Sequence, residues 1–299
     1  MKILVTGSHG LVGSALVKLL KEKGHNILRL VRHQKNSKAG EIYWNPEAGS
    51  IDKGALEGLG IEAVVHLAGE NIAGGRWCAE RKKRIRDSRV KGTRILAEAL
   101  AHLQNPPKVF ISASAVGFFG SRGDEALTED SSAGKSFLAE VCREWEEATQ
   151  VAMQKGIRVV NLRFGVILSR DGGALKKMLL PFKLGAGGVI GSGKQYFSWI
   201  SLDDAVHVIE FALQNEKLKG PVNTVAPEAV TNREFTKTLG RVLWRPTLFP
   251  LPASTARLAF GEMADEMLLA SLRVKPVKLE QAGFRFEYPE LRGALKHLL

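Results

Sequence analysis

The chain opens with Met1-Lys2-Ile3-Leu4-Val5-Thr6-Gly7-Ser8-His9-Gly10-Leu11-Val12-Gly13, and this stretch decides the fold. Its apolar run from Ile3 to Val5 is typical of a strand that is buried on both faces. Three glycines follow, and apolar residues then recur at helical spacing as far as Leu20. The stretch therefore predicts a strand, a tight glycine turn and a helix.

Gly7, Gly10 and Gly13 have separate expected tasks in this turn. One glycine permits the turn, one lets the backbone approach a pyrophosphate, and one lets the helix pack close to the strand. The N-terminus of the helix offers unpaired N–H groups and a positive dipole end to phosphates. Because this is the first strand–helix unit and a second strand follows on schedule, we predict a dinucleotide-binding turn rather than a ligand-free turn of another α/β protein.

Composition describes an ordinary soluble globular protein. The 299 residues are 44% hydrophobic and 25% charged, which suits one large or two interlocked domains. No apolar run is long enough to span a bilayer, and the N-terminus lacks a signal peptide's cleavage site. Cys78 and Cys142 are too few for a disulfide framework or a cysteine zinc site, so we expect no metal. We expect a cytoplasmic protein without a membrane partner.

The net charge is strongly basic, because 43 Lys and Arg residues face 31 Asp and Glu residues and give +12. Three interpretations compete: a nucleic-acid partner, a site for anionic ligands, and a solvated surface. The densest basic run, Arg81 to Arg86, has no interleaved aromatic residues, and no nucleic-acid-binding module is visible. We favour a solvated face together with attraction for a phosphorylated ligand, and expect no nucleic-acid partner.

The second strand, Asn26 to Val31, ends where a dinucleotide-binding fold reads the adenosine ribose. An NAD enzyme usually carries Asp or Glu at this end, roughly 20 residues beyond the glycines, to accept from the 2′-hydroxyl. Here Arg32 stands in that place, with Lys35 close by, and the first acid is Glu41. Since a guanidinium suits a 2′-phosphate, we predict NADP(H) rather than NAD, against the alternative of a surface arginine at a strand end.

Further strands and helices alternate along the chain with short connections. We expect strands at 41–44, 63–69, 109–117, 157–162 and 222–225, and helices at 79–102, 137–154, 174–184 and from about 201. This alternation predicts a Rossmann-type, doubly wound parallel α/β sheet with a smaller, mainly helical substrate-side domain. We place the NADP-binding domain at 1–167 plus 198–226, and the small substrate-side and C-terminal domain at 168–197 plus 227–299.

The chain also resembles a known family, an atypical branch of the extended short-chain dehydrogenases/reductases (the NAD-dependent epimerase/dehydratase superfamily), usually labelled "epimerase family protein". The spacing Gly-x-x-Gly-x-x-Gly is similar to the superfamily fingerprint. The branch is indicated by segments over nearly the whole chain: 67–72, 88–89, 112–117, 137–142, 145–146, 162–168, 178–182, 199–200 and 226–227. The tail, with 250–252, 261–263, 273–274 and 283–284, is similar to the C-terminal domain of unknown function of this branch.

The resemblance implies NADP binding at the glycine turn, Arg32, Leu67-Ala68 and Arg89. Two roles are equally open for Arg89. Its guanidinium could be aimed at the cofactor phosphates, or its side chain could lie along the surface with the guanidinium in water. Glu70 and Arg163 are further candidate polar groups near the nicotinamide end, whereas His66 is expected to be structural. The cofactor-binding residues predicted together are Gly7, His9, Gly10, Leu11, Val12, Gly13, Arg32, Leu67, Ala68, Gly69, Glu70, Arg89, Ser112 and Arg163.

One expected feature is missing from the sequence. Short-chain oxidoreductases use a Tyr-x-x-x-Lys pair, whose lysine lowers the tyrosine pKa so that its hydroxyl can pass a proton. Four places after each of the three tyrosines stand Glu47, Ile200 and Arg292, so the pair is absent. Phe137 and Val141 occupy the corresponding positions on the expected helix, and neither can carry a proton.

Ser114 is then the one candidate catalytic residue, because it aligns with the serine that hydrogen-bonds a substrate hydroxyl or carbonyl in the superfamily. The alternative is a serine that satisfies turn backbone. Asp203 and Asp204 have two alternative roles, as catalytic acids or as helix caps. Residues 194–196 are candidates for contact with a substrate. We expect either an oxidoreductase or epimerase acting on an unknown hydroxylated, nucleotide-sugar-like small molecule, or a non-catalytic NADP(H)-binding sensor or scaffold.

Overall fold

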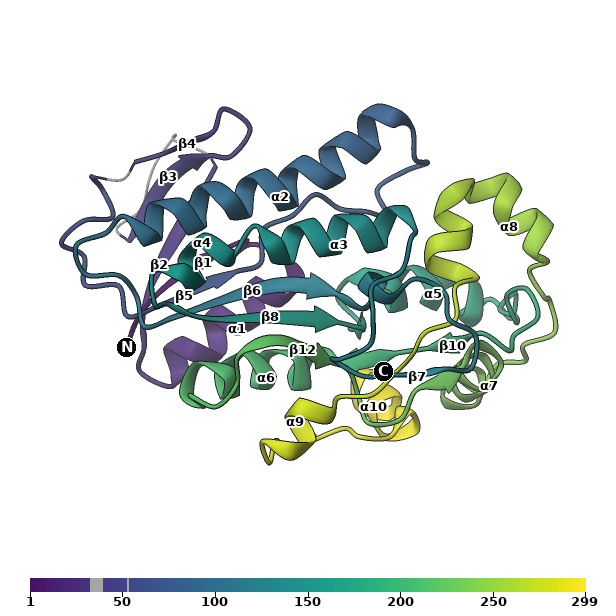
Figure 1. Cartoon of the computed structure of the whole chain (residues 1–299). Coiled ribbons are helices and arrows are strands. Elements are labelled where there is room, and N and C mark those ends of the chain that lie inside the picture. Colours follow the sequence, from purple (N-terminus) through teal and green to yellow (C-terminus); the bar gives the residue numbers. More distant parts are fainter. Residues whose placement is uncertain (33–39, 53) are drawn as a thin grey trace.

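The structure is a computed structural model, and it describes residues 1–32, 40–52 and 54–299. Lys35, predicted to stand beside Arg32, lies outside the described residues. Figure 1 shows a sheet at the centre with helices on both sides, and the helix α8 (Ala253–Phe260) at the end far from the N-terminus. The predicted α/β class is confirmed.

The main sheet has eight strands in the order β12-β8-β6-β5-β1-β2-β3-β4. All neighbours are parallel except β3 and β4, which are antiparallel. The strand bounds are β1 Lys2–Thr6, β2 Asn26–Val31, β3 Glu41–Asn45, β4 Ser50–Ile51, β5 Ala63–His66, β6 Val109–Ala115, β8 Arg158–Phe164 and β12 Gly220–Thr224. Every strand predicted from the sequence is present, while the short β4 was not predicted.

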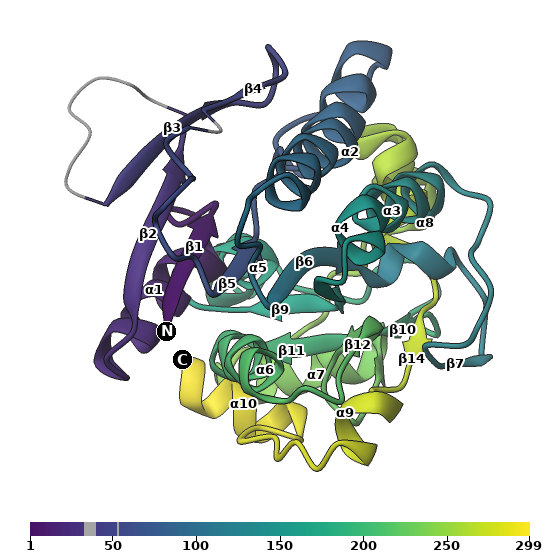
Figure 2. The same ribbon diagram turned by 60° about the vertical axis from the view of Figure 1, so that its left-hand side comes forward.

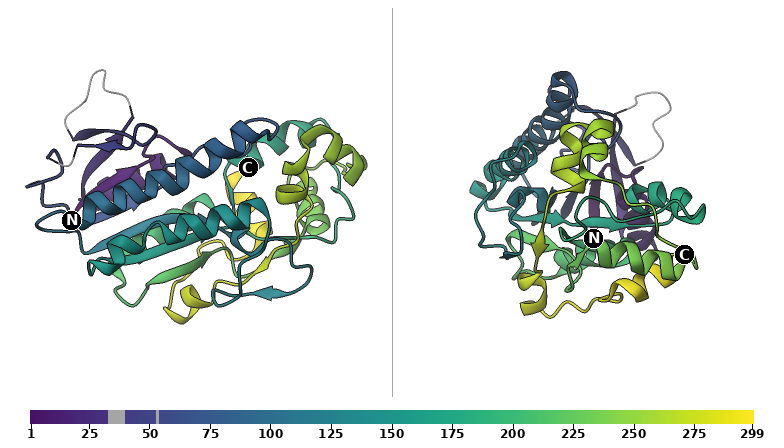
Figure 3. Two further views of the ribbon diagram at one scale, coloured as in Figure 1. Left: turned by 45° about the horizontal axis from the view of Figure 1, so that its top comes forward. Right: turned by 90° about the vertical axis from the view of Figure 1, so that its right-hand side faces the viewer.

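Both faces of the sheet are covered by helices (Figure 2). Ile3 and Val5 pack towards α1 (Leu11–Glu22) and α6 (Leu202–Gln214), and Leu4 packs towards α2 (Ala79–Ala101). These three side chains are fully buried, as expected of a central strand in a parallel sheet. The helix α3 (Phe137–Glu147) lies beside α2 (Figure 3).

The predicted single helix over 137–154 is interrupted. It divides into α3 and a short α4 (Gln150–Gln154). At the break the Thr149 N–H donates to Glu146 O at 3.1 Å and its hydroxyl donates to the same carbonyl at 2.6 Å. A side-chain hydroxyl that takes a backbone carbonyl competes with continuation of the helix, which explains the difference.

A second apolar core joins the remaining segments. Its buried residues come from α5 (Gly173–Lys183), α7 (Asn232–Val242) and α10 (Leu291–Leu298), together with Trp199 and Val230. The other C-terminal helices are α8 (Ala253–Phe260) and α9 (Val277–Gln281), and Leu279 of α9 packs in the same core as α6. The short strands are β7 Ala126–Leu127, β9 Val166–Leu168, β10 Tyr196–Phe197, β11 Trp199–Ser201, β13 Val230–Thr231 and β14 Arg273–Val274. The division into two domains at the predicted boundaries stays a prediction.

The strand order reverses between β1 and β5. From β1 the chain proceeds outward through β2 and β3, and from β5 it proceeds through β6 and β8 to the other edge. In open α/β sheets the crevice outside the carboxyl ends of the strands at such a reversal is the usual ligand site. The glycine turn follows β1 and the segment 67–69 follows β5, so both lie at this crevice.

Candidate functional site

The three glycines of the turn meet different surroundings. Gly7 has φ +66°, and a Cβ there would lie 2.7 Å from the backbone carbon of Leu67. A Cβ on Gly13 would lie 2.1 Å from the carbonyl oxygen of Gly7. Gly10 differs, because a Cβ there would meet only Gly7 O within 4 Å, at 3.3 Å. Gly7 thus packs against the backbone that follows β5, and Gly13 lets α1 pack against the turn, while Gly10 stays open for the approach of a ligand.

The N-terminus of α1 begins at this open glycine. Gly10 is the N-cap and makes no side-chain cap hydrogen bond. The first N–H groups of an α-helix have no partner inside the helix, so those of Leu11, Val12 and Gly13 are available to an anion. The side chain of Leu11 lies against Gly172, because a Cβ at Gly172 would be 3.1 Å from Leu11 Cδ1. The turn therefore leaves the first N–H groups of α1 open to an anion.

His66 is structural, as expected. It is fully buried, its Nδ1 lies 2.6 Å from Thr6 Oγ1, and its Nε2 lies 3.0 Å from Thr93 Oγ1. Thr6 Oγ1 accepts from the N–H groups of Leu67 and Ala68 at 3.2 Å each. Its own proton is therefore donated to His66 Nδ1, which makes the imidazole neutral with the proton on Nε2. Burial lowers the pKa of His66 to about 3, and the ring serves to fix the 67–68 backbone beside the glycine turn.

Arg89 of α2 reaches the same crevice. A Cβ on Gly69 would lie 3.3 Å from Arg89 Cζ, and Arg89 Nη1 donates to Ile85 O at 3.1 Å. Its guanidinium lies 5.1 Å from the ring centre of Trp145. Burial lowers the pKa of Arg89, against opposing contributions from Cys142 and Glu70. Within the part of the chain that the structure describes, no carboxylate forms an ion pair with this arginine, and a half-buried cation of this kind suits an anionic ligand.

Other predicted cofactor residues lie around the crevice. Arg32 is exposed at the end of β2, and His9 is exposed in the turn. The Glu70 N–H donates to Ser88 Oγ at 3.0 Å, so the loop after β5 is tied to α2. Ser112 is fully buried on β6, with its hydroxyl 3.3 Å from Ala113 O. Their contacts with a cofactor stay predictions.

Ser114, Glu146 and Arg163 form one buried network. Ser114 Oγ donates to Glu146 Oε1 at 2.7 Å, and Arg163 donates to both oxygens of Glu146, from Nε at 2.8 Å and from Nη2 at 2.9 Å. Ser114 and Arg163 are 2% and 3% exposed. Arg163 also lies with Cζ 3.5 Å from the ring centre of Phe118, a cation–π contact. Arg163, predicted near the nicotinamide, is thus held by protein groups, and its role towards a cofactor stays a prediction.

The positions expected for a tyrosine and a lysine are apolar. Phe137 packs edge-on against Trp77, with ring centres 5.3 Å apart, and Val141 is buried. Met263 and Met267 from the tail join the same cluster. Cys142 follows on α3, and burial raises its thiol pKa to about 12, so it is a protonated thiol rather than a nucleophile at neutral pH.

The tail also supplies a carboxylate to this helix. Glu266 Oε2 accepts from Ser136 Oγ at 2.7 Å, and Glu266 Oε1 accepts from the Phe137 N–H at 3.1 Å. A carboxylate at a helix N-terminus satisfies unpaired N–H groups and the dipole. The C-terminal segment therefore closes the end of α3 at which the superfamily places its tyrosine.

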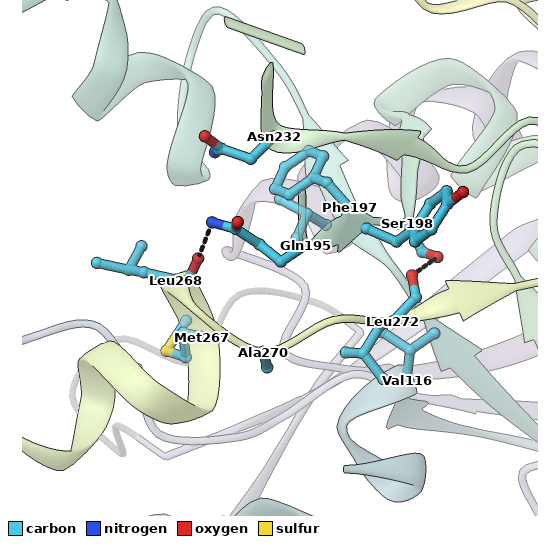
Figure 4. A pocket seen from close by; sticks show the side chains of 11 residues that line it. Val116, Gln195, Phe197, Ser198, Asn232, Met267, Leu268, Ala270 and Leu272 are labelled. Carbon is cyan, nitrogen blue, oxygen red and sulfur yellow. Dashed lines mark hydrogen bonds between the residues drawn. The ribbon is translucent and has the colours of Figure 1, made fainter. Parts of the chain in front are cut away.

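A cavity lies next to this region, between residues 195–198 and the tail (Figure 4). Val116, Gln195, Tyr196 and Met267 are among its lining residues. Gln195 Nε2 donates to Leu268 O at 3.1 Å, which ties the two segments together. Of the predicted substrate-facing stretch, Gln195 and Tyr196 line the cavity, whereas Lys194 is exposed and is not part of the lining.

Asp203 and Asp204 both hold the tail in place. Asp204 is fully buried and accepts from the N–H groups of Glu287 at 2.7 Å and Tyr288 at 3.0 Å. Asp203 lies 3.1 Å from His297 Nε2. Ser201 is the N-cap of α6 and accepts from the Asp204 N–H at 3.0 Å. These contacts explain both acids without a catalytic role.

Comparison with known proteins agrees with this geometry. Residues 3–225 match the family model described as "NAD dependent epimerase/dehydratase family", and residues 251–298 match a domain of unknown function, DUF1731. The chain is 45% identical over 293 residues to the epimerase family protein Mb2239 of Mycobacterium bovis, covering 98% of this chain and 96% of that protein.

Solved structures of relatives have the same fold. The human epimerase family protein SDR39U1 (isoform 2), crystallised with NADPH, is 35% identical, with a TM-score of 0.90 over 100% of this chain and 99% of that chain. A nucleoside-diphosphate sugar epimerase of Corynebacterium glutamicum is 39% identical, with a TM-score of 0.82; the match covers this chain fully and 58% of that chain. The resemblance drawn from the motifs is confirmed, and the chain belongs to the NAD-dependent epimerase/dehydratase family, with the extended short-chain dehydrogenase/reductase fold.

Proposed function

We propose that the protein binds NADP(H) at the glycine turn and works as an oxidoreductase on a small hydroxylated metabolite. The observation that carries this proposal is the open face of Gly10 at the N-terminus of α1, in the crevice between β1 and β5. The NADPH in the structure of the human relative supports the choice of cofactor.

The residues of the crevice fit such a cofactor. The N–H groups of Leu11, Val12 and Gly13 would hold the pyrophosphate, and Arg32 would hold the 2′-phosphate. Arg89 would supply a second positive charge, because it lies against Gly69 without a carboxylate partner among the described residues. The buried His66–Thr6 pair would keep the 67–68 backbone in contact with the cofactor.

When bound, the nicotinamide supplies hydride transfer, and the chain has to orient the substrate. Ser114 would do so, as the serine that aligns with the substrate-orienting serine of the superfamily. Its only proton is donated to Glu146, so its lone pairs are left to accept a hydrogen bond from a substrate hydroxyl. Arg163 fixes Glu146 by two hydrogen bonds and thereby fixes the orientation of Ser114. An alcohol substrate therefore suits this serine better than a carbonyl, which would need a donor.

A second candidate function is NADP(H) binding without turnover. It is favoured by Phe137 and Val141, which replace the proton-carrying pair. Phe137 packs in an apolar cluster with Met263 and Met267 from the tail, and Val141 is buried. In that case the state of the cofactor would be sensed through the contact between α3 and the tail, and a partner protein would read it.

The two candidates differ in one measurement. The protein is loaded with NADP⁺ and supplied with a panel of polyols, sugars and nucleotide sugars, and the absorbance of reduced nicotinamide is followed. Formation of NADPH that is slowed in Ser114→Ala supports the oxidoreductase. Tight NADPH binding with no turnover on the panel or on a cell extract of small metabolites supports the non-catalytic function. Failure to bind either NADP⁺ or NADPH would contradict both.

A further inference from the structure

The two longest segments of the chain without an acidic residue lie in its C-terminal half. The first runs from Gly172 to Leu202 and the second from Phe235 to Gly261. Each of them carries four Lys or Arg residues and no Asp or Glu, whereas 31 of the 299 residues of the whole chain are Asp or Glu. Because acids are absent, each of the two segments has a net charge of +4.

The two segments lie side by side at the end of the molecule that carries α5, α7 and α8, far from the N-terminus (Figure 1). Arg245 Nε donates to Lys183 O at 2.9 Å, and the Leu251 N–H donates to Val189 O at 2.9 Å. Gly188 lies against Phe249, because a Cβ there would be 1.8 Å from Phe249 O. Their side chains thus contribute to one surface.

Large apolar side chains stand out from this surface. Trp244 is 88% exposed, and four further residues are between 65% and 74% exposed: Leu180, Leu184, Leu248 and Phe249. Leu180 and Leu184 are four residues apart, and so share one side of the end of α5, opposite the buried Leu179 and Phe182. Lys183, Arg241 and Arg245 of the same two segments are exposed as well. We call these five apolar and three basic residues the Trp244 surface.

Trp244 is also held in an unfavourable backbone conformation. The helix α7 ends in the hydrogen bonds of a Schellman motif, from the Arg245 N–H to Gly240 O at 2.9 Å and from the Trp244 N–H to Arg241 O at 3.2 Å. The motif puts Trp244 at the left-handed position usually taken by glycine, with φ 55°, the only non-glycine residue with positive φ among the described residues. An indole that is 88% exposed gains too little packing within the chain to offset this strain, which points to a role outside the chain.

We propose that the Trp244 surface docks the protein on an anionic lipid surface. Trp, Phe and Leu side chains would enter the boundary between headgroups and acyl chains, and the surrounding cations would face the anionic headgroups. This combination of an aromatic and aliphatic centre with Lys and Arg around it is that of a peripheral attachment. The searched helices, those of the described residues, include none long and apolar enough to cross a bilayer. The expectation of no membrane partner rested on spanning segments, and attachment from one side needs none.

Charge argues against a second copy as the occupant. A second copy docking by the same surface would bring two acid-free, basic faces together, which is electrostatically unfavourable. Anionic headgroups complement Lys183, Arg241 and Arg245, and the exposed indole suits the boundary between headgroups and acyl chains.

Vesicle sedimentation of the full chain tests this proposal. The probes are phosphatidylcholine vesicles with and without phosphatidylglycerol, in the presence and absence of NADPH. Binding to the anionic vesicles, weakened by salt and accompanied by a blue shift of tryptophan fluorescence, is the expected result. Equal or absent binding to both kinds of vesicle would overturn the proposal. Because cofactor binding is measured separately, a failure here leaves the proposed oxidoreductase untouched.

Trp244→Gly is the most informative variant. It should weaken binding to anionic vesicles on the order of tenfold, through loss of the indole. It should at the same time raise Tm by about 2 °C, because glycine removes the left-handed strain. Met153→Gln on α4, which removes another exposed apolar side chain, is the control and should bind as the parent does. The pair Lys183→Gln with Arg241→Gln should weaken binding roughly tenfold.

Three results would assign the surface differently. Vesicle binding that survives both Trp244→Gly and the double neutralisation would show that another surface is responsible. A dimer in light scattering that Trp244→Gly dissociates would identify a second copy as the occupant. Salt-sensitive binding of polyglutamate that is as tight as vesicle binding, and that depends on Trp244, would identify an acidic polypeptide.

Discussion

Ser114 donates its hydroxyl proton to Glu146, and Arg163 holds the same carboxylate by two hydrogen bonds. The three residues come from β6, α3 and β8, so the network joins two neighbouring strands to the helix that covers them. Ser114 and Arg163 are direct neighbours in the register of β6 and β8. The candidate catalytic serine is therefore placed by packing of the sheet and not by a flexible loop.

Ser114→Ala should separate binding from turnover. The variant keeps the glycine turn, so its Kd for NADPH should stay within about twofold of the parent value. Its turnover on any substrate found should fall about a hundredfold, which is the usual effect of losing one positioned hydrogen-bonding group. Titration calorimetry and steady-state kinetics check the two quantities. Unchanged turnover would remove Ser114 from the site.

Arg163→Met should destabilise the fold strongly. The substitution leaves the carboxylate of Glu146, whose side chain is 13% exposed, without its cation, and breaking a buried pair costs about 3–5 kcal/mol of the free energy of unfolding. Arg86→Met is the matched control, because Arg86 pairs with Glu144 at the surface and exposed pairs are worth about 1 kcal/mol or less. Denaturant unfolding measures both. Equal costs would mean that the Glu146–Arg163 pair is not structural.

Gly10→Ala should mainly affect NADPH binding, whereas Gly13→Ala should mainly affect the stability of the fold. At Gly10 the added methyl group meets only Gly7 O, at 3.3 Å, and the backbone has φ −75°, so stability should change by less than about 1 kcal/mol. The methyl group would occupy the approach of the pyrophosphate, and NADPH binding should be lost. At Gly13 the added methyl group would lie 2.1 Å from Gly7 O, so the free energy of unfolding should fall by roughly 2 kcal/mol or more. Tight NADPH binding by Gly10→Ala would place the pyrophosphate elsewhere.

His66 should make the protein sensitive to acid. Its pKa is about 3 when folded and about 6.5 when unfolded, so the unfolded chain binds the extra proton between these values. The stability that the neutral ring contributes is therefore complete above pH 6.5 and is lost as the pH falls towards 3, at about 1.4 kcal/mol per pH unit. His66→Gln should flatten the dependence of unfolding free energy on pH between 4 and 6 by about this slope. His25→Gln, at a partly exposed histidine, is the control, and equal flattening in both variants would contradict the assignment.

The sequence predicted what depends on local pattern. Ile3 to Val5 and the glycine spacing predicted the first strand, the turn and α1, and alternation of apolar segments predicted the parallel sheet. These features follow from short-range sterics and periodicity. A glycine open to a ligand was also expected, although which of the three glycines meets a ligand and which meet protein could be assigned only from the packing.

The features that the sequence did not predict depend on contacts between distant segments. Glu146 was part of a family motif without a role, because its partners Ser114 and Arg163 lie on strands that only the sheet order brings together. Glu266 and Met263 could not be placed, since nothing in a linear pattern shows that the tail reaches the N-terminus of α3. The division of one predicted helix at Thr149 depends on a single hydroxyl–carbonyl contact. Long-range pairing of polar groups is therefore the part that sequence patterns do not encode.

The most direct measurement is the affinity of the protein for NADPH and NADH by titration calorimetry, with Arg32→Asp beside the parent chain. We predict that the parent binds NADPH at least about tenfold more tightly than NADH, because the Arg32 guanidinium can take the 2′-phosphate. Arg32→Asp should abolish most of this preference by weakening NADPH alone. Equal affinities in the parent, or an equal loss for both cofactors in the variant, would contradict an NADP(H) site at this strand end.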